Sequence, residues 1–247
     1  MNTKLFQSDR IKLNQFPARE NILTGLILLA GALLRLRQYL TGRSLWLDEA
    51  MLALNIVNRN YSGLFQPLDY DQGAPIGFML VEKTFSLIFG RNEFSLRLFP
   101  LLIGLASLWL FYLLLKRSKS GAGFWVALTL FAFNPRLIYY SSEVKQYVVD
   151  VAVTIALLLC ALPLFQQASR KAFATLAFVG ALALWFSHSS LFVLAGIGLA
   201  LFISYFQKRD FTALGSIIGM GALWLADLAL LYSLTLSDLR SNSYMHA

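Results

Sequence analysis

The sequence has few charged residues, few prolines and almost no cysteine. Of its 247 residues, 14% are charged and 57% are apolar, whereas a soluble domain has about 25% charged and about 45–50% apolar residues. The single cysteine excludes a disulfide within the chain, and 16 glycines with 6 prolines exclude a collagen-like or low-complexity composition. A core of this size cannot bury so much apolar surface, so the composition predicts a polytopic membrane protein.

The basic excess does not point to a nucleic-acid partner. The net charge is +8 and the pI is about 9.7, but the Lys and Arg residues punctuate hydrophobic segments and form no polar basic face. We therefore predict that the positive charge sets the membrane topology and contacts anionic membrane lipids, with no nucleic acid involved.

Seven stretches approach the 20 or so apolar residues that a membrane-spanning helix needs. They are residues 21–40, 98–115, 121–140, 148–165, 172–186, 190–206 and 211–234, of which the fifth is the shortest. The predicted fold class is an all-α polytopic membrane protein with about seven transmembrane helices.

An eighth apolar stretch, residues 74–90, contains Glu82 and Lys83. Basic residues also occupy three short connections, at 116–119, 170–171 and 208–209. If 74–90 lies on the membrane surface, all three connections are cytoplasmic together with the basic N-terminus, as the positive-inside rule favours. If it crosses, all three lie outside. We favour the surface position.

This topology divides the chain into three parts. Residues 1–20 form a cytoplasmic tail, residues 21–234 form the transmembrane module with a long external loop at 41–96, and residues 235–247 form a short external tail. The first span has a charged leader without an A-x-A cleavage site, which indicates an uncleaved anchor. We expect a multi-pass protein of the plasma membrane, the inner membrane in a bacterium.

Acidic and aromatic residues then gather on the external side. Asp48 and Glu49 follow the first span, Asp71 lies further along the same loop, and the next external loops carry Glu143, Lys145, Tyr147 and His188. Paired carboxylates on separate loops suit acid–base chemistry. The alternative for Asp48 and Glu49 is a helix cap.

Two ionisable residues at or within the spans also have alternatives. Arg35, at the outer end of the first span, either snorkels to headgroups or binds an anionic ligand. Asp227, inside the last span, is either functional or a polar contact with a neighbouring helix.

Five motifs in order give the sequence a resemblance to a known family. They are S-L-W-L-D-E-A at 44–50, D-Q-G-A-P-I-G-F at 71–78, F-G-R-N-E-F-S-L-R-L-F-P at 89–100, F-N-P-R-L-I-Y-Y-S-S-E-V-K-Q-Y at 133–147 and F-S-H-S-S-L-F at 186–192. Together they resemble the polyprenyl-phosphate-sugar-dependent glycosyltransferases of the GT-C superfamily, above all glycosyltransferase family 39, the bacterial relatives of protein O-mannosyltransferases. The resemblance covers about residues 22–206 and implies membrane-parallel helices in the first external loop.

The resemblance implies roles for the external residues. An acid early in the first external loop is the catalytic base, either Asp48 or Glu49, and we favour Asp48. Lys145, helped by Arg35, binds the phosphate of the polyprenyl-phosphate sugar donor, and His188 touches the phosphate or the acceptor. Glu143, Tyr147 and Asp71 shape the site. Lys145 stands where the family motif E-x-R-x-Y has arginine, so the charge is kept and the bidentate geometry is lost.

Several questions stay open on the sequence alone. No residue cluster demands a metal, although some enzymes of this superfamily use a divalent cation. The acceptor is a protein, a lipid or a glycan. The chain is short for the family, so a catalytic module, a fragment and a non-catalytic subunit that binds the lipid-linked sugar are all considered. A transporter is less favoured, because the spans are nearly free of ionisable groups.

Overall fold

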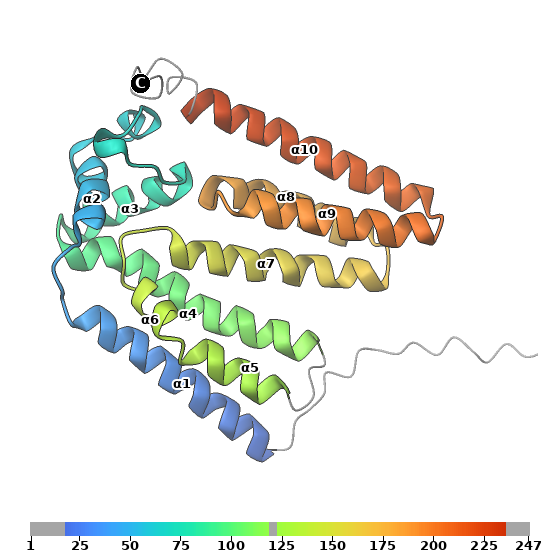
Figure 1. Ribbon diagram of the computed structural model, residues 1–247, viewed down its shortest axis with the longest axis horizontal. Coiled ribbons are helices and arrows are strands. Elements are labelled where there is room, and N and C mark those ends of the chain that lie inside the picture. The colour runs from blue at the N-terminus through green and yellow to red at the C-terminus, as the bar shows by residue number, and fades with distance from the viewer. Residues whose placement is uncertain (1–17, 119–122, 236–247) are drawn as a thin grey trace, which may run out of the picture.

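The computed structural model describes residues 18–118 and 123–235, with side chains from residue 21. Every regular element in these ranges is a helix (Figure 1), which confirms the all-α prediction there. The predicted tails, 1–20 and 235–247, lie almost wholly outside the described residues.

Five helices in the described part of the chain are long and apolar enough to cross a membrane. They are α1 (Ala18–Leu40), α4 (Glu93–Arg117), α7 (Tyr147–Gln166), α9 (Ser190–Gln207) and α10 (Phe211–Thr235). By length and composition, the chain is therefore a multi-pass membrane protein.

The predicted third span, 121–140, is divided into two shorter helices. α5 (Gly123–Ala132) has 10 residues and α6 (Pro135–Tyr140) has 6. The side chain of Asn134 accepts hydrogen bonds from the backbone N–H groups of Arg136 and Leu137, at 2.9 and 3.3 Å, and so caps a new helix. Pro135 occupies the first position of that helix, where its missing N–H costs nothing. The Asn-Pro pair therefore ends the predicted span early.

The predicted fifth span is also short. α8 (Arg170–Phe186) has 17 residues, fewer than the 20 or so that span a bilayer without adjustment. It packs against α7 and α10 in the bundle. The described residues thus support five spanning helices, fewer than the seven or so that hydropathy predicts.

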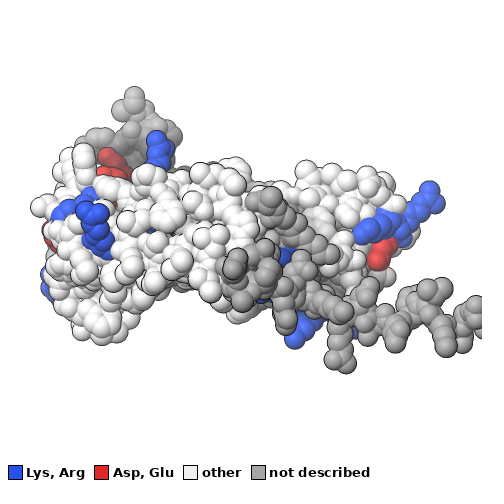
Figure 2. Space-filling model, turned by 90° about the horizontal axis from the view of Figure 1, so that it is seen from below, with Lys and Arg blue, Asp and Glu red and all other residues white. Residues whose placement is uncertain are grey.

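The loops sort to the two ends of the bundle (Figure 1). One end holds α2 (Leu47–Asn58), the 3-10 turns η1 (Ser62–Phe65) and η2 (Asp69–Asp71), and α3 (Ile76–Phe89). The connections around 133–146 and 187–189 lie at that same end, and those at 167–169 and 208–210 lie at the opposite end. In the face drawn in Figure 2, charged side chains lie mainly toward the ends, and most of the surface between is uncharged.

Close helix packing fixes the loop that precedes α7. A Cβ atom added at Gly104 of α4 would lie 2.3 Å from the Oγ atom and 2.6 Å from the Cβ atom of Ser141. Ser141 is fully buried, so the absent side chain at position 104 lets residues 141–146 approach α4. This contact holds the loop at 141–146 against α4.

Asp227 makes a contact between helices. Its Oδ1 atom accepts a hydrogen bond of 3.0 Å from the indole N–H group of Trp185 on α8. Of the two alternatives for this residue, the polar contact with a neighbouring helix is the one present in the structure.

Candidate active site

Asp48, Lys145 and Gln72 form a polar cluster where three segments meet. The Nζ atom of Lys145 lies 2.9 Å from the Oδ2 atom of Asp48 and donates a hydrogen bond of 2.8 Å to the Oε1 atom of Gln72. The Lys145 side chain is 7% exposed, whereas that of Asp48 is 63% exposed. The ammonium group of Lys145 is therefore buried, and the carboxylate of Asp48 is exposed to solvent.

The cluster keeps Asp48 ionised. The hydrogen bond from Lys145 lowers the pKa of Asp48 below its ordinary value, against a smaller opposing effect of burial, and Gln72 lowers it further. At neutral pH, Asp48 is a carboxylate with exposed lone pairs that can accept a hydrogen bond from a substrate hydroxyl.

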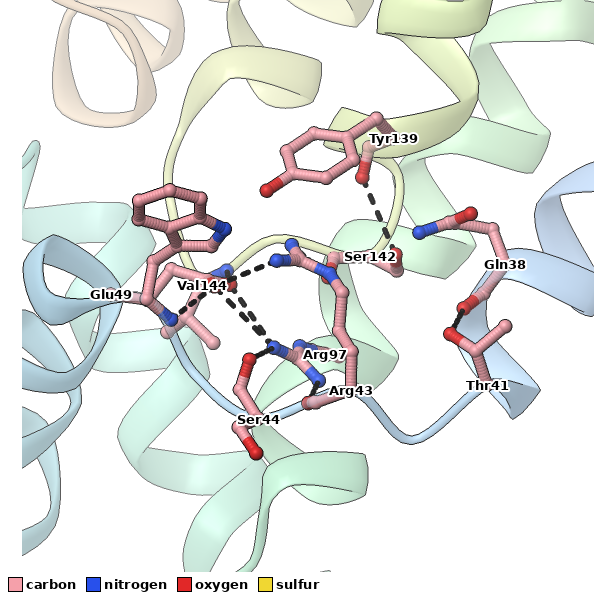
Figure 3. Close-up of polar contacts among 10 residues, drawn as sticks. Gln38, Thr41, Arg43, Ser44, Glu49, Arg97, Tyr139, Ser142 and Val144 are labelled. Carbon is pink, nitrogen blue, oxygen red and sulfur yellow. Dashed lines mark hydrogen bonds and ion pairs between the residues drawn. The ribbon is translucent and has the colours of Figure 1, made fainter.

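Glu49, the next residue, lies in the opposite environment (Figure 3). Its side chain is 0% exposed and contacts two arginines, with Arg43 Nη1 at 3.3 Å and Arg97 Nη2 at 3.4 Å. Its carboxylate also accepts hydrogen bonds from the backbone N–H groups of Val144, at 2.9 Å, and Trp46, at 3.0 Å. The bond from Trp46 gives Glu49 the helix-cap role that the sequence left as an alternative.

The two arginines tie Glu49 to the surrounding loops. Arg97 donates to the backbone carbonyl groups of Arg43 and Ser44. Arg43 donates to the carbonyl group of Ser142, and its guanidinium group lies 4.2 Å from the centroid of the Tyr139 ring. These contacts, most of them visible in Figure 3, join the start of α2 to α4 and to the loop that carries Lys145.

Glu143 and Tyr147 lie near Asp48, close enough for their charges to interact, and their role in shaping the site stays a prediction. Burial raises the pKa of the Glu143 carboxyl above its ordinary value, and the nearby charge of Glu49 adds to this rise. Its Oε2 atom is buried without a hydrogen-bond partner in the described structure. The ring of Tyr147 lies 4.9 Å from that of Tyr140. Glu143 therefore binds its proton more tightly than Asp48 does.

His188 lines a pocket of about 360 Å³ beside the cluster. Gln72 lines the same pocket, whose other walls are mainly apolar side chains from the η1–η2 region, α3 and the end of α10. Burial lowers the pKa of His188 below its ordinary value, and the charge of Asp150 opposes that effect. Of the Asp48–Lys145–Gln72 cluster, Gln72 is the residue that shares this pocket with His188.

Arg35 and Asp71, for which the resemblance also implies a role in the site, make no hydrogen bond or ion pair with the Asp48–Lys145–Gln72 cluster in the described structure. Arg35 is fully buried and donates hydrogen bonds of 3.0 Å to the carbonyl groups of Gly31 and Ala132. It therefore holds the end of α5, and its role in binding phosphate stays a prediction. Asp71 is exposed in η2 and has a left-handed backbone, with φ of 51°.

Sequence reasoning assigned no role to Gln72, Arg43, Arg97 or Asp150. Gln72 and Arg97 lie within motifs quoted for the resemblance, and Arg43 immediately precedes another. The partners of Gln72 and Arg97 are distant in the chain, since Lys145 lies 73 positions after Gln72 and Glu49 lies 48 positions before Arg97. Their position in or beside a motif was the one sequence feature that marked these residues. A motif does not show which distant residue each of them contacts.

The described residues contain no cluster of side chains suited to bind a metal ion. No three His, Cys, Asp or Glu side chains lie close enough together there to hold one ion. The Asp48 carboxylate has an ammonium partner instead.

The fold and the site define a multi-pass helical membrane protein with an exposed carboxylate, a buried ammonium group and an apolar pocket at one end of the bundle. Residues 73–232 match the family described as dolichyl-phosphate-mannose-protein mannosyltransferase. The match covers more than half of the chain, and the chain belongs to this family of lipid-linked-sugar glycosyltransferases.

The family match covers some of the candidate site residues and not others. Glu143, Lys145, Tyr147 and His188 lie inside it, whereas Asp48 lies before its first residue. The match begins later and ends later than the resemblance seen in the motifs. A search of curated proteins finds no match to the chain.

Proposed function

We propose that this protein transfers a sugar from a polyprenyl-phosphate donor to an acceptor hydroxyl, with inversion, on the extracytoplasmic face of the membrane. The observation that carries the proposal is the Asp48–Lys145–Gln72 cluster, which sets an ionised carboxylate beside a buried ammonium group. Family membership supports the donor class, since the family description names a lipid phosphate sugar and a protein acceptor.

Asp48 acts as the base in this proposal. The acceptor oxygen forms a bond to the anomeric carbon while the bond from that carbon to the phosphate oxygen breaks. The hydroxyl proton passes to Asp48, and the bonding electron pair stays on the phosphate. Asp48 suits this role because its carboxylate is exposed and ionised.

Lys145 stabilises the leaving phosphate. Negative charge develops on that phosphate in the transition state, so a cation fixed in advance favours the reaction. The low exposure of Lys145 and its bond to Gln72 limit the movement of its ammonium group. Gln72, which accepts the hydrogen bond from Lys145, also lines the pocket, so a phosphate bound at that end of the pocket would lie near this ammonium group.

The apolar pocket suits the prenyl chain of the donor. A second groove of about 350 Å³, lined by apolar residues of α8, α9 and α10, shares Leu184 and Leu191 with the first pocket. The two cavities thus adjoin, with a polar end at Gln72 and His188 and an apolar end between the helices. An amphipathic molecule with a phosphate head and a hydrocarbon tail fits this order of surfaces.

Substitution of Asp48 by Asn tests the proposal. We expect transfer from polyprenyl-phosphate mannose to a peptide rich in Ser and Thr to fall about 100-fold or more, as loss of a general base does. Asp69→Asn is the matched control, because Asp69 is an exposed acid of the same loop that pairs with Arg59 at 3.0 Å. Undiminished transfer in a folded Asp48→Asn protein would remove Asp48 as the base.

The membrane side is tested separately by labelling. Gln66 and Gln167 are exposed and lie at opposite ends of the bundle. With Cys160 replaced by alanine, we expect Gln66→Cys to react with an impermeant thiol reagent from outside and Gln167→Cys from inside. The reversed pattern contradicts the proposed orientation.

A further inference from the structure

The turn that leads into Gln72 has a strained backbone. Tyr70 and Asp71 are consecutive, and their φ angles of 64° and 51° lie in the left-handed region that residues with a side chain rarely adopt. Such strain persists only where the surrounding structure holds it. Gln72 follows directly, and its Oε1 atom accepts the hydrogen bond of 2.8 Å from Lys145. Whatever fixes the turn therefore also fixes the partner of the ammonium group.

Asn55 on α2 holds the first residue of this turn. Its Oδ1 atom accepts a hydrogen bond of 2.9 Å from the backbone N–H group of Asp69, and its Nδ2 atom donates one of 3.1 Å to the carbonyl group of the same residue. The Nδ2 atom also donates to the carbonyl group of Met51 at 2.9 Å, one turn earlier in α2. Asn55 is 2% exposed, so a buried amide joins the helix to both polar backbone groups of Asp69.

The side chain of Gln72 is oriented by the same two segments. Its Nε2 atom donates to the carbonyl group of Tyr70 at 3.3 Å and lies 3.9 Å from the Sδ atom of Met51. The Oε1 atom is thereby left to face Lys145, which as an ammonium group can only donate. A chain of contacts therefore runs from α2 through the turn to the site.

Arg59 contacts the same loop by a different route. Its Nη2 atom lies 3.0 Å from the Oδ2 atom of Asp69, and its Nη1 atom donates to the carbonyl group of Pro67 at 2.8 Å. The Asp69 side chain is 67% exposed, and an exposed ion pair adds little rigidity. The buried bonds of Asn55 to the Asp69 backbone are therefore the stronger restraint on the turn.

We propose that Asn55 is a positioning residue that fixes the strained turn at 69–71 and, through Gln72, holds the ammonium group of Lys145 in place for the donor phosphate. The use of that ammonium group by a phosphate rests on the proposed function, whereas the connection from Asn55 to Lys145 belongs to the protein alone. Without Asn55 the turn leaves its left-handed backbone conformation, and Gln72 moves away from Lys145. Asn55 itself contacts no reacting atom.

The test measures the reactivity of Lys145 and needs neither donor nor turnover. The purified full chain in detergent is treated with acetic anhydride, which acylates unprotonated amines, and the rate at Lys145 is followed by peptide mass spectrometry. We expect Asn55→Ala to raise this rate about 10-fold, the factor that corresponds to loss of one hydrogen bond to a charged group.

Lys83 is an internal reference for this measurement. It is 5% exposed, and its Nζ atom donates to the carbonyl group of Val57 in the last turn of α2 at 2.9 Å. General loosening of α2 would raise the acylation rates of Lys83 and Lys145 together. Loss of the positioning role should raise the rate at Lys145 and leave that at Lys83 unchanged.

A double-substitution cycle with Gln72→Leu tests the route of the effect. Gln72→Leu removes the acceptor on Lys145, so it should raise the rate by the same factor, and the addition of Asn55→Ala should raise it no further. Asn60→Ala is the matched control, because the Oδ1 atom of Asn60 accepts bonds of 2.7 and 3.0 Å from residues of η1, before the turn. Neither lysine should change its rate in that variant.

Three results overturn the inference. They are an unchanged rate at Lys145 in Asn55→Ala, an equal rise at Lys83, and a double variant in which the effects of Asn55→Ala and Gln72→Leu multiply. If Asn55→Ala fails to fold, Asn55→Asp retains the acceptor for the backbone N–H group of Asp69, loses both donated bonds, and is judged by the same rates.

Farnesyl monophosphate tests the proposed function separately. A phosphate bound beside Lys145 should slow the acylation of this residue in the wild-type protein. Coupled rates at Lys145 without protection by farnesyl monophosphate contradict the proposed place of the phosphate alone. Protection without any effect of Asn55→Ala contradicts the role of Asn55 alone.

Discussion

Asp48 and Glu49 are neighbours in the chain, yet the two regions that they enter differ in nearly every physical property. Glu49 lies in a closed network with Arg43, Arg97 and the backbone of Val144. Asp48 lies in an open cluster, where its partner is the ammonium group of Lys145. Successive residues of a helix point about 100° apart, so a single turn supplies both an anchor and a reactive group.

A charged residue close to a candidate site is therefore not necessarily a reactive one. Glu49 has protein partners for both of its oxygens and no access to solvent. Asp48 has exposed lone pairs. In our proposal Glu49 fixes the loops and Asp48 reacts, and the following substitutions test that division, from the largest expected effect to the smallest.

Glu49→Gln should cause the largest loss of stability. Removal of the charge leaves Arg97 buried without its anionic partner, which costs about 3–5 kcal/mol. Resistance to unfolding by heat and by sodium dodecyl sulfate measures the loss. Asp48→Asn should cost about 1 kcal/mol or less in the same assay, because the Asp48 side chain is exposed and an asparagine oxygen can still accept a hydrogen bond from Lys145. Equal stability of the two variants would erase the distinction between the two regions.

Lys145→Met should alter the pH dependence of transfer. Lys145 lowers the pKa of Asp48, so the ionised form persists to lower pH in the wild type and the acid limb of activity lies below the ordinary carboxyl range. Without Lys145 that pKa rises, and the acid limb moves to higher pH. Transfer at neutral pH should also fall about 10–100-fold, because the leaving phosphate loses a cation. An unmoved acid limb contradicts the assignment of Asp48.

Gly104→Ala should disturb the open cluster from a distance. The new methyl group meets Ser141, and overpacking of this kind costs about 1–3 kcal/mol. Because Ser141 begins the loop that carries Lys145, transfer should fall together with stability. Gly196→Ala is the control, since its added Cβ atom meets no heavy atom within 4 Å apart from its chain neighbours and the backbone of its own helix. The same loss in both variants indicates a general effect on the helices.

Asp69→Asn should have the smallest effect. Its ion pair with Arg59 lies in the same loop, but the Asp69 side chain is 67% exposed, and exposed pairs contribute about 0–1 kcal/mol. Both unfolding and transfer should stay close to wild type. A loss comparable to that of Glu49→Gln would show that exposure does not separate the two kinds of acid in this loop.

The membrane class and the helical fold could be predicted from the sequence alone, and the sequence also predicts on which side of the membrane each loop lies. These follow from apolar run length and charge placement, which are local in the chain. The Asn134–Pro135 pair that divides 121–140 is also a helix-breaking signal in the local sequence. Hydropathy averaged over the whole segment concealed the break, so 121–140 was expected to span, and the other expected span that falls short lies in the 17-residue helix α8.

Only the tertiary structure decided which acid is buried and which is open. Glu49 meets Val144 across 95 positions of the chain, and Lys145 meets Gln72 across 73. Burial and ion pairing depend on contacts between distant segments of the chain. Such contacts cannot be predicted from the hydrophobic periodicity of one segment.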